Sequence, residues 1–249
     1  ACFSQIKSQL EAQNVKYIPG VSYDETSNYF VEKENQFAQA IQAAKSVDVV
    51  ILCLGENSYA EKPGDLNDLT ISPLQRKLAD AIAATGKPVV LVLNEGRPRC
   101  IREFEPLMKA VVQTYLPGNY GGDALADILY GDINPSGRLP YNYPSYPNSI
   151  VNYYHKPAEE QMGSAGAYKY ESDYNPQWEF GHGLSYTTFT YSNLKVSKDV
   201  FGKNENVQIS VDIKNTGKMA GKESVLLFTS DLIASVTPDV KRLRRFEKI

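Results

Sequence analysis

The sequence predicts an α/β fold: a three-layer α/β sandwich with a mostly parallel sheet, followed by a partial antiparallel β-sandwich. Continuous apolar runs at residues 47–55, 88–96 and 110–118 alternate with segments of helical periodicity. This alternation is typical of a parallel sheet covered by helices. From residue 207 to residue 213 apolar side chains recur at every second position, which indicates antiparallel strands instead.

Each helix expected in the α/β part has its own signal. Residues 34–48 place apolar side chains at helical spacing, and residues 72–87 begin with a serine N-cap and a proline in the first turn. Residues 121–132 begin with a pair of glycines, and residues 3–13 also have the pattern of a helix. The apolar runs predict strands buried on both faces, in which Cys53 is a small buried hydrophobe.

The change of pattern along the chain predicts two domains. Residues 1–185 form the α/β sandwich, including a connecting segment from about residue 132 that is rich in Tyr, Pro and Gly. Residues 186–249 form the antiparallel β-sandwich. A complete sandwich of this kind needs roughly seven strands, and only three or four fit here. We therefore expect a chain that is truncated inside its first domain and again inside its last one.

Composition excludes several classes of protein. The formal net charge is −3, and no stripe of Lys and Arg is interleaved with aromatics, so no nucleic-acid partner is expected. The basic stretch at residues 241–248 is interpreted as a solvated strand or loop. No apolar run approaches the roughly 18 residues of a membrane helix, so no membrane association is expected. The three cysteines show no CxxC spacing that would indicate structural zinc.

The loop at residues 56–65 concentrates acid directly after the first apolar run. Glu56, Glu61 and Asp65 lie there among Gly, Asn, Ser and Pro. Parallel sheets bind ligands at the carboxyl ends of their strands, so this loop should lie beside the loops at residues 94–99 and 117–122. A glutamate in such a place can act as a general acid or base if its pKa rises towards neutrality. The alternative is an acidic loop that is simply exposed to solvent.

Other catalytic chemistries lack their motifs. The chain has no GxGxxG, GxxxxGK[ST], GxSxG or HExxH motif, and it has two histidines. Glycoside hydrolysis, by contrast, needs only two carboxyl groups that flank one bond.

Four segments, in their order along the chain, resemble glycoside hydrolase family 3 in the portion after its catalytic barrel. They are VDVVILCLGENSYAEKPGDLNDLTI, KPVVLVLNEGRP, LPGNYGGDALADILYGDINPSGRLPYNYP and WEFGHGLSYTTF. The antiparallel tail resembles the fibronectin type III-like domain that follows in many members. The resemblance implies part of a retaining, exo-acting β-glycosidase, most often a β-glucosidase.

The resemblance also implies roles for residues of the acidic loop. Glu56 matches the acid/base position best, and Glu61 is the alternative. Tyr59, Glu61 and Asp65 would contact the substrate, an oligosaccharide or other β-glycoside, and Asp65 would orient the loop. The nucleophile, an Asp, would lie in an N-terminal barrel domain, and no metal or organic cofactor is expected.

The implied partner of this chain is therefore the barrel domain of its parent protein, without which the fragment should be inactive. By resemblance the parent would be periplasmic or secreted. Two alternatives remain: a non-catalytic module that binds carbohydrate or another domain through its Tyr-rich loops, and a purely structural domain.

Overall fold

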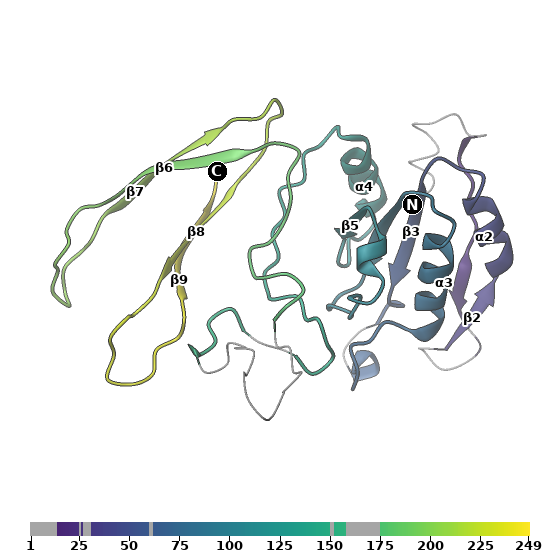
Figure 1. The fold of residues 1–249 in the computed structure, drawn as a ribbon, viewed down its shortest axis with the longest axis horizontal. Helices are drawn as coiled ribbons and strands as arrows, with labels where there is room; N and C mark the ends of the chain where they lie inside the picture. The colour runs from purple at the N-terminus through teal and green to yellow at the C-terminus, as the bar shows by residue number, and fades with distance from the viewer. Residues whose placement is uncertain (1–13, 25, 27–30, 60–61, 150–151, 158–174) are drawn as a thin grey trace, which may run out of the picture.

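The computed structural model describes residues 14–24, 26, 31–59, 62–149, 152–157 and 175–249. It contains an α/β unit and an antiparallel unit, joined by a long connecting segment that runs between them (Figure 1). The predicted fold class is confirmed, whereas the helix expected at residues 3–13 lies outside the described residues. The predicted domain division after residue 185 stays a prediction.

The α/β unit is built on a parallel sheet in the order β3-β4-β5. Its strands and helices are β1 (Gly20–Tyr23), β2 (Glu32–Asn35), α2 (Phe37–Ala44), β3 (Val50–Gly55), α3 (Pro73–Ala83), β4 (Val89–Asn94), β5 (Ala110–Gln113) and α4 (Gly121–Tyr130). Short 3-10 helices occur at Lys62–Gly64 and Glu105–Leu107. The Ser72 hydroxyl accepts a hydrogen bond from the Gln75 backbone N–H at 3.2 Å, which confirms the predicted N-cap of α3.

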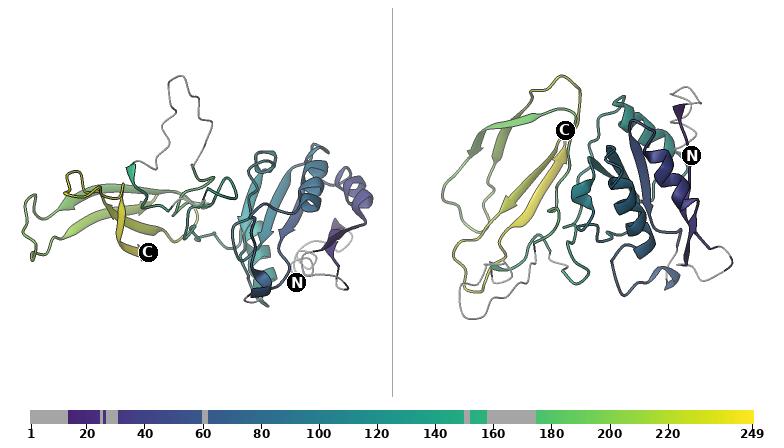
Figure 2. Two further views of the ribbon diagram at one scale, coloured as in Figure 1. Left: turned by 90° about the horizontal axis from the view of Figure 1, so that it is seen from below. Right: turned by 45° about the vertical axis from the view of Figure 1, so that its right-hand side comes forward.

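The main core lies between the sheet and α3. Leu52 pairs with Leu91 and Leu54 with Leu93 across the parallel ladder, so these four side chains point to the same face. They belong to one buried cluster that also contains Leu78, Ala79 and Ile82 of α3. Helices lie on both sides of the sheet, as the three-layer prediction requires (Figure 2). Val92 points to the second face and is 3% exposed.

The prediction that every parallel strand is buried on both faces is wrong for β3. Val49 is 49% exposed and Cys53 is exposed, so Cys53 is not the buried hydrophobe that its apolar neighbours predicted. β3 is an edge strand of the three-stranded sheet, and Cys53 lies on the face opposite to that of Leu52 and Leu54.

The antiparallel hairpin β1–β2 was missed by the sequence interpretation. Gly20 pairs with Asn35 and Tyr23 with Glu32, and the hairpin packs against α2 and α3. Strand β2 reads EKEN, and a short strand of polar residues carries no periodic hydrophobic signal.

The connecting segment is packed although it is irregular. Its described part between α4 and residue 189 contains no helix and no strand longer than an isolated bridge, the one between Tyr143 and Trp178. Tyr143 is fully buried, and its ring lies 5.1 Å from that of Trp178. The segment therefore forms part of the core of the α/β unit.

The antiparallel unit consists of two hairpins. Its strands are β6 (Phe189–Val196), β7 (Ile209–Asn215), β8 (Ser224–Thr229) and β9 (Arg242–Lys248). β6 pairs with β7 and β8 with β9, and most of their side chains are at least partly exposed. The basic stretch at residues 241–248 is thus a solvated strand, as interpreted from the sequence. An ion pair at 2.9 Å joins Arg138 of the connecting segment to Glu223 beside β8.

Candidate active site

Glu56 is held between two arginines of the neighbouring loop. It directly follows β3, and its side chain is only 3% exposed. Oε1 of Glu56 lies 2.8 Å from Nη1 of Arg99 and 3.2 Å from Nε of Arg97. Both arginines follow β4, so the loops after two adjacent parallel strands meet at the carboxyl edge of the sheet, as predicted.

The backbone before Glu56 is held by hydrogen bonds with the side chain of Gln75. The amide of Gln75 on α3 accepts from the N–H of Gly55 at 2.8 Å and donates to its carbonyl at 2.7 Å. The Tyr23 hydroxyl donates to the same carbonyl at 2.8 Å. Gly55 has a φ of 144°, and a Cβ there would lie 2.1 Å from the Asn94 carbonyl oxygen. Only glycine permits this approach of the two strand ends, which sets the direction in which Glu56 leaves the sheet.

Arg99 joins the two ends of the acidic loop. Besides its bond to Glu56, its guanidinium donates to the carbonyl of Leu69 at 3.1 Å and to the carbonyl of Thr70 at 2.5 Å. The backbone supports the same contact, because the N–H of Cys100 donates to the Leu69 carbonyl at 2.8 Å. One side chain thus closes residues 56–70 into a loop with fixed ends.

Tyr59 packs where three loops meet. The guanidinium carbon of Arg97 lies 4.3 Å from the centre of its ring, a cation–π contact. A Cβ on Gly96 would lie 2.4 Å from the Tyr59 hydroxyl and 3.2 Å from Leu116, which follows β5. Because Gly96 has no side chain, the loops after all three parallel strands can approach each other. The expected contact of Tyr59 with substrate stays a prediction.

The other predicted site residues lie further along the same loop. Asp65 is exposed, and its backbone N–H donates to the Lys62 carbonyl at 3.0 Å in the short 3-10 turn. Glu61 lies outside the described residues. The structure therefore brings Glu56, Tyr59 and Asp65 into one loop and leaves their predicted roles as predictions.

A second buried carboxyl group, which the sequence interpretation missed, lies beneath Arg99. Glu95 is fully buried, and its Oε1 accepts from the Tyr143 hydroxyl at 2.9 Å and from the Arg99 backbone N–H at 3.2 Å. Burial raises the pKa of Glu95 to about 7, an effect that the hydrogen bonds from Arg99 and Tyr143 only partly offset. Burial likewise raises the pKa of Tyr143 well above its usual value.

The sequence contains one signal for the residues around Glu95. Glu95, Arg97 and Arg99 form a dense run of charge directly after a buried strand, in a loop already placed at the ligand edge. No local signal marks Tyr143, because it lies in an irregular segment 44 residues from Arg99.

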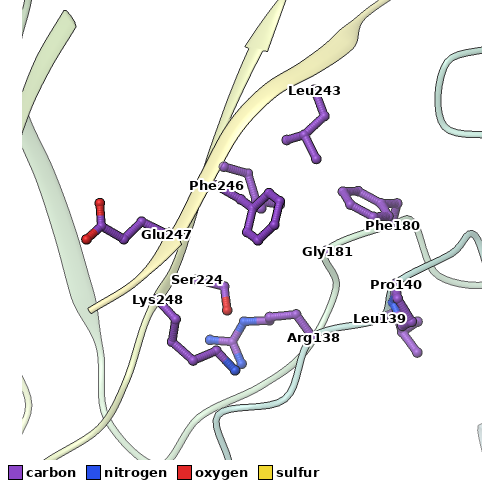
Figure 3. A pocket seen from close by; sticks show the side chains of 11 residues that line it. Arg138, Leu139, Pro140, Phe180, Gly181, Ser224, Leu243, Phe246, Glu247 and Lys248 are labelled. Carbon is purple, nitrogen blue, oxygen red and sulfur yellow. The ribbon is translucent and has the colours of Figure 1, made fainter.

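A hollow in the described part of the chain lies elsewhere. It measures about 480 Å³ and lies between the connecting segment and the β8–β9 hairpin (Figure 3). Its lining is mainly apolar, including Leu139, Phe180, Leu243 and Phe246. None of the predicted site residues lines it. Among the described residues no group of three His, Cys, Asp or Glu side chains could hold a metal ion.

A comparison with known protein families gives a match over most of the chain. The sequence profile described as the glycosyl hydrolase family 3 C-terminal domain matches residues 2–186. The chain belongs to glycosyl hydrolase family 3. Its residues at the carboxyl edge of the parallel sheet therefore belong to the C-terminal domain of a family whose members are glycoside hydrolases.

Individual relatives of this family 3 chain are β-glucosidases. It is 40% identical over 248 residues to a lysosomal β-glucosidase of Dictyostelium discoideum, which covers 95% of the chain. It is 39% identical over 218 residues, 85% of the chain, to a periplasmic β-glucosidase of Salmonella typhimurium strain LT2. A crystal structure of a β-glucosidase from Listeria innocua in complex with glucose aligns with a TM-score of 0.78 at 31% identity, covering 85% of the chain.

The family 3 chain corresponds to a minor part of each of these proteins. It spans 28% of the length of the two sequence relatives and 30% of the Listeria chain. No helix in the described part of the chain is long and apolar enough to cross a membrane.

Proposed function

We propose that the protein to which this chain belongs is a retaining, exo-acting β-glucosidase, and that the loop at residues 56–65 supplies its general acid/base. The nucleophile would come from a barrel domain facing the carboxyl edge of the sheet. The observation that carries the proposal is the acidic loop itself. It leaves a parallel strand at the edge where such sheets bind ligands, and Arg99 fixes both of its ends.

Within this loop we assign the proton transfer to Glu61, the alternative that the resemblance left open, and a structural role to Glu56. A general acid must come within hydrogen-bond reach of the glycosidic oxygen. Glu56 has a side chain 3% exposed, and its Oε1 is engaged by two guanidinium groups. These contacts suit a residue that anchors the loop. Glu61 is the other glutamate of this loop.

The proposed substrate is a β-glucoside, because the relatives are named as β-glucosidases. We propose a location outside the cytoplasm, which the periplasmic relative supports. The 249 residues alone should show no glycosidase activity, since retention requires a second carboxyl group about 5 Å from the first.

The test compares Glu61→Gln and Glu56→Gln in the full-length protein with aryl β-glucosides of different leaving groups. Loss of the general acid should lower kcat/KM by about 10² to 10⁴ for a poor leaving group, because acid catalysis contributes that much. An activated dinitrophenyl glucoside needs little protonation and should be affected far less at the first step. Added azide should then restore turnover and yield the β-glucosyl azide.

The two variants are expected to differ. Glu61→Gln should show the leaving-group dependence and the azide rescue, whereas Glu56→Gln should lower activity and stability together without rescue. Full activity of Glu61→Gln on the poor leaving group would contradict its assignment. An inactive full-length wild-type protein on all aryl β-glycosides would contradict the proposed function.

A further inference from the structure

Glu95 occupies an unusual position for a carboxyl group. It follows β4 directly and is fully buried, although it makes no ion pair among the described residues. Its contacts are instead with the Tyr143 hydroxyl and the backbone N–H of Arg99. A buried carboxyl group without an opposite charge is costly, so its presence calls for a physical reason.

The contacts of Tyr143 suggest that reason. Its hydroxyl oxygen lies 2.9 Å from Oε1 of Glu95 and 2.7 Å from the carbonyl oxygen of Arg99. A phenol has one proton, so it cannot donate to both oxygens at once. If Glu95 is neutral, its O–H can donate to Tyr143, and Tyr143 can donate to Arg99. Glu95 and Tyr143 then hold both the N–H and the carbonyl of Arg99.

Arg99 is the residue on which this small network acts. Its side chain, 12% exposed, reaches Glu56 at the start of the acidic loop and the carbonyls of Leu69 and Thr70 at its end. A guanidinium can bind all three groups only if its backbone is fixed, because its planar donors have a set geometry. Any shift of the Arg99 backbone would therefore move both ends of the loop.

We propose that Glu95 is a positioning residue for the acid/base loop, acting through Tyr143 and the backbone of Arg99 to keep the two ends of residues 56–70 together. The inference rests on the proposed function of that loop. The hydrogen bonds of Glu95 go to Tyr143 and to the Arg99 backbone, and not to a described residue of the loop. Its raised pKa favours the neutral form that the chain of hydrogen bonds requires. Two charges act on its pKa: the Glu56 carboxylate raises it and the Arg99 guanidinium lowers it. The charge of Glu95 in turn raises the pKa of Cys100 and of Tyr141.

The test uses Glu95→Ala and Glu95→Gln in the full-length protein. Glu95→Ala should lower kcat on a poor leaving group about 10- to 100-fold, the range expected for a displaced catalytic group, with less than a twofold change in KM. Glu95→Gln keeps an oxygen acceptor and supplies an N–H donor, as a neutral carboxyl does, so it should restore most of kcat. It should also remove from the kcat–pH profile any change that arises from ionisation of Glu95.

Hydrogen exchange separates failure of this inference from failure of the proposed function. Amide exchange within residues 56–70 should be faster in Glu95→Ala than in wild type and close to wild type in Glu95→Gln, whether or not the loop carries the acid. Glu103→Gln is the matched control, since Glu103 is 51% exposed and pairs with Arg76 on the surface. It should change neither kcat nor exchange.

Two results would overturn the inference: wild-type exchange and kcat in a folded Glu95→Ala protein, or a Glu95→Gln protein as impaired as Glu95→Ala. If Glu95→Ala does not fold, Tyr143→Phe provides the decisive measurement, because it removes only the hydroxyl that joins Glu95 to Arg99. It should speed exchange in residues 56–70 and lower kcat with KM retained. Unchanged exchange and kcat in Tyr143→Phe would equally overturn the inference.

Discussion

The parallel strands of the α/β unit and the antiparallel strands after residue 188 are stabilised in different ways. In β4 every residue from Val89 to Leu93 except Val90 is buried, whereas in β6 no residue is buried. The contacts of the antiparallel hairpins with the rest of the chain include aromatic rings, such as that of Phe228 in β8, which lies 6.0 Å from the ring of Tyr153 and 6.3 Å from that of Phe180. The candidate site thus belongs to the region with the packed core, and disturbing that core should affect the site most.

The largest expected effect comes from truncating a leucine in each region. Leu93→Ala should lower the free energy of unfolding by about 2–5 kcal/mol, because Leu93 is fully buried in β4. Leu194→Ala in β6 should change it by no more than about 0.5 kcal/mol, because Leu194 is 68% exposed. Urea denaturation followed by the fluorescence of Trp178, the single tryptophan, measures both.

Trp178 suits this comparison because its ring packs on Tyr143 in the core of the α/β unit. Equal losses in the two variants would show that the antiparallel hairpins contribute to the same cooperative core.

A smaller difference is expected from removing one hydroxyl in each region. Tyr143→Phe should cost about 1–3 kcal/mol, because it removes the hydrogen bonds of a buried hydroxyl to Glu95 Oε1 and to the Arg99 carbonyl. Tyr191→Phe removes a 2.9 Å hydrogen bond to Glu223 from a side chain that is 48% exposed, and should cost less than about 1 kcal/mol. The same denaturation experiment measures both, and a larger loss in Tyr191→Phe would reverse the comparison.

The same division explains how much of the fold the sequence could predict. Strands β3 and β4 were visible because a parallel sheet needs long apolar segments, and α3 was visible from its serine cap. The exposure of Cys53 could not be predicted from the sequence, because an edge strand and a central strand have the same apolar pattern. The β1–β2 hairpin is stabilised by contacts with α2 and α3, which leave no periodic trace in its own residues.

For the candidate site, the sequence located the loops but not the partners. Chain topology alone brings the loops at residues 56–65 and 94–99 to one edge of the sheet. Which side chain anchors the loop depends on contacts between loops, here the two arginines around Glu56. Tyr143 reaches Glu95 across 48 residues of sequence, and no local pattern predicts such a contact.

Glu95 and Asp239 of the antiparallel unit should also differ in how each makes the free energy of unfolding depend on pH. Burial raises the pKa of Glu95 from 4.5 to about 7, so the folded protein binds its proton more tightly than the unfolded chain. Stability from this group is complete below pH 4.5 and falls as the pH rises to 7, by at most about 1.4 kcal/mol per pH unit.

Asp239 should behave in the opposite sense. Hydrogen bonds from Lys156 and Arg242 lower its pKa below 3.8, so its stabilising effect is present above that pH and is lost as the pH falls further. Urea denaturation of wild type, Glu95→Gln and Asp239→Asn across pH 3–8 measures both. Relative to wild type, Glu95→Gln should gain stability as the pH rises from 4.5 to 7, whereas Asp239→Asn should differ by a constant amount over that window. A constant difference for Glu95→Gln as well would mean that Glu95 is ionised in the folded protein at pH 4.5. The neutral form of Glu95, which lets Tyr143 donate to the Arg99 carbonyl, would then not occur near neutral pH.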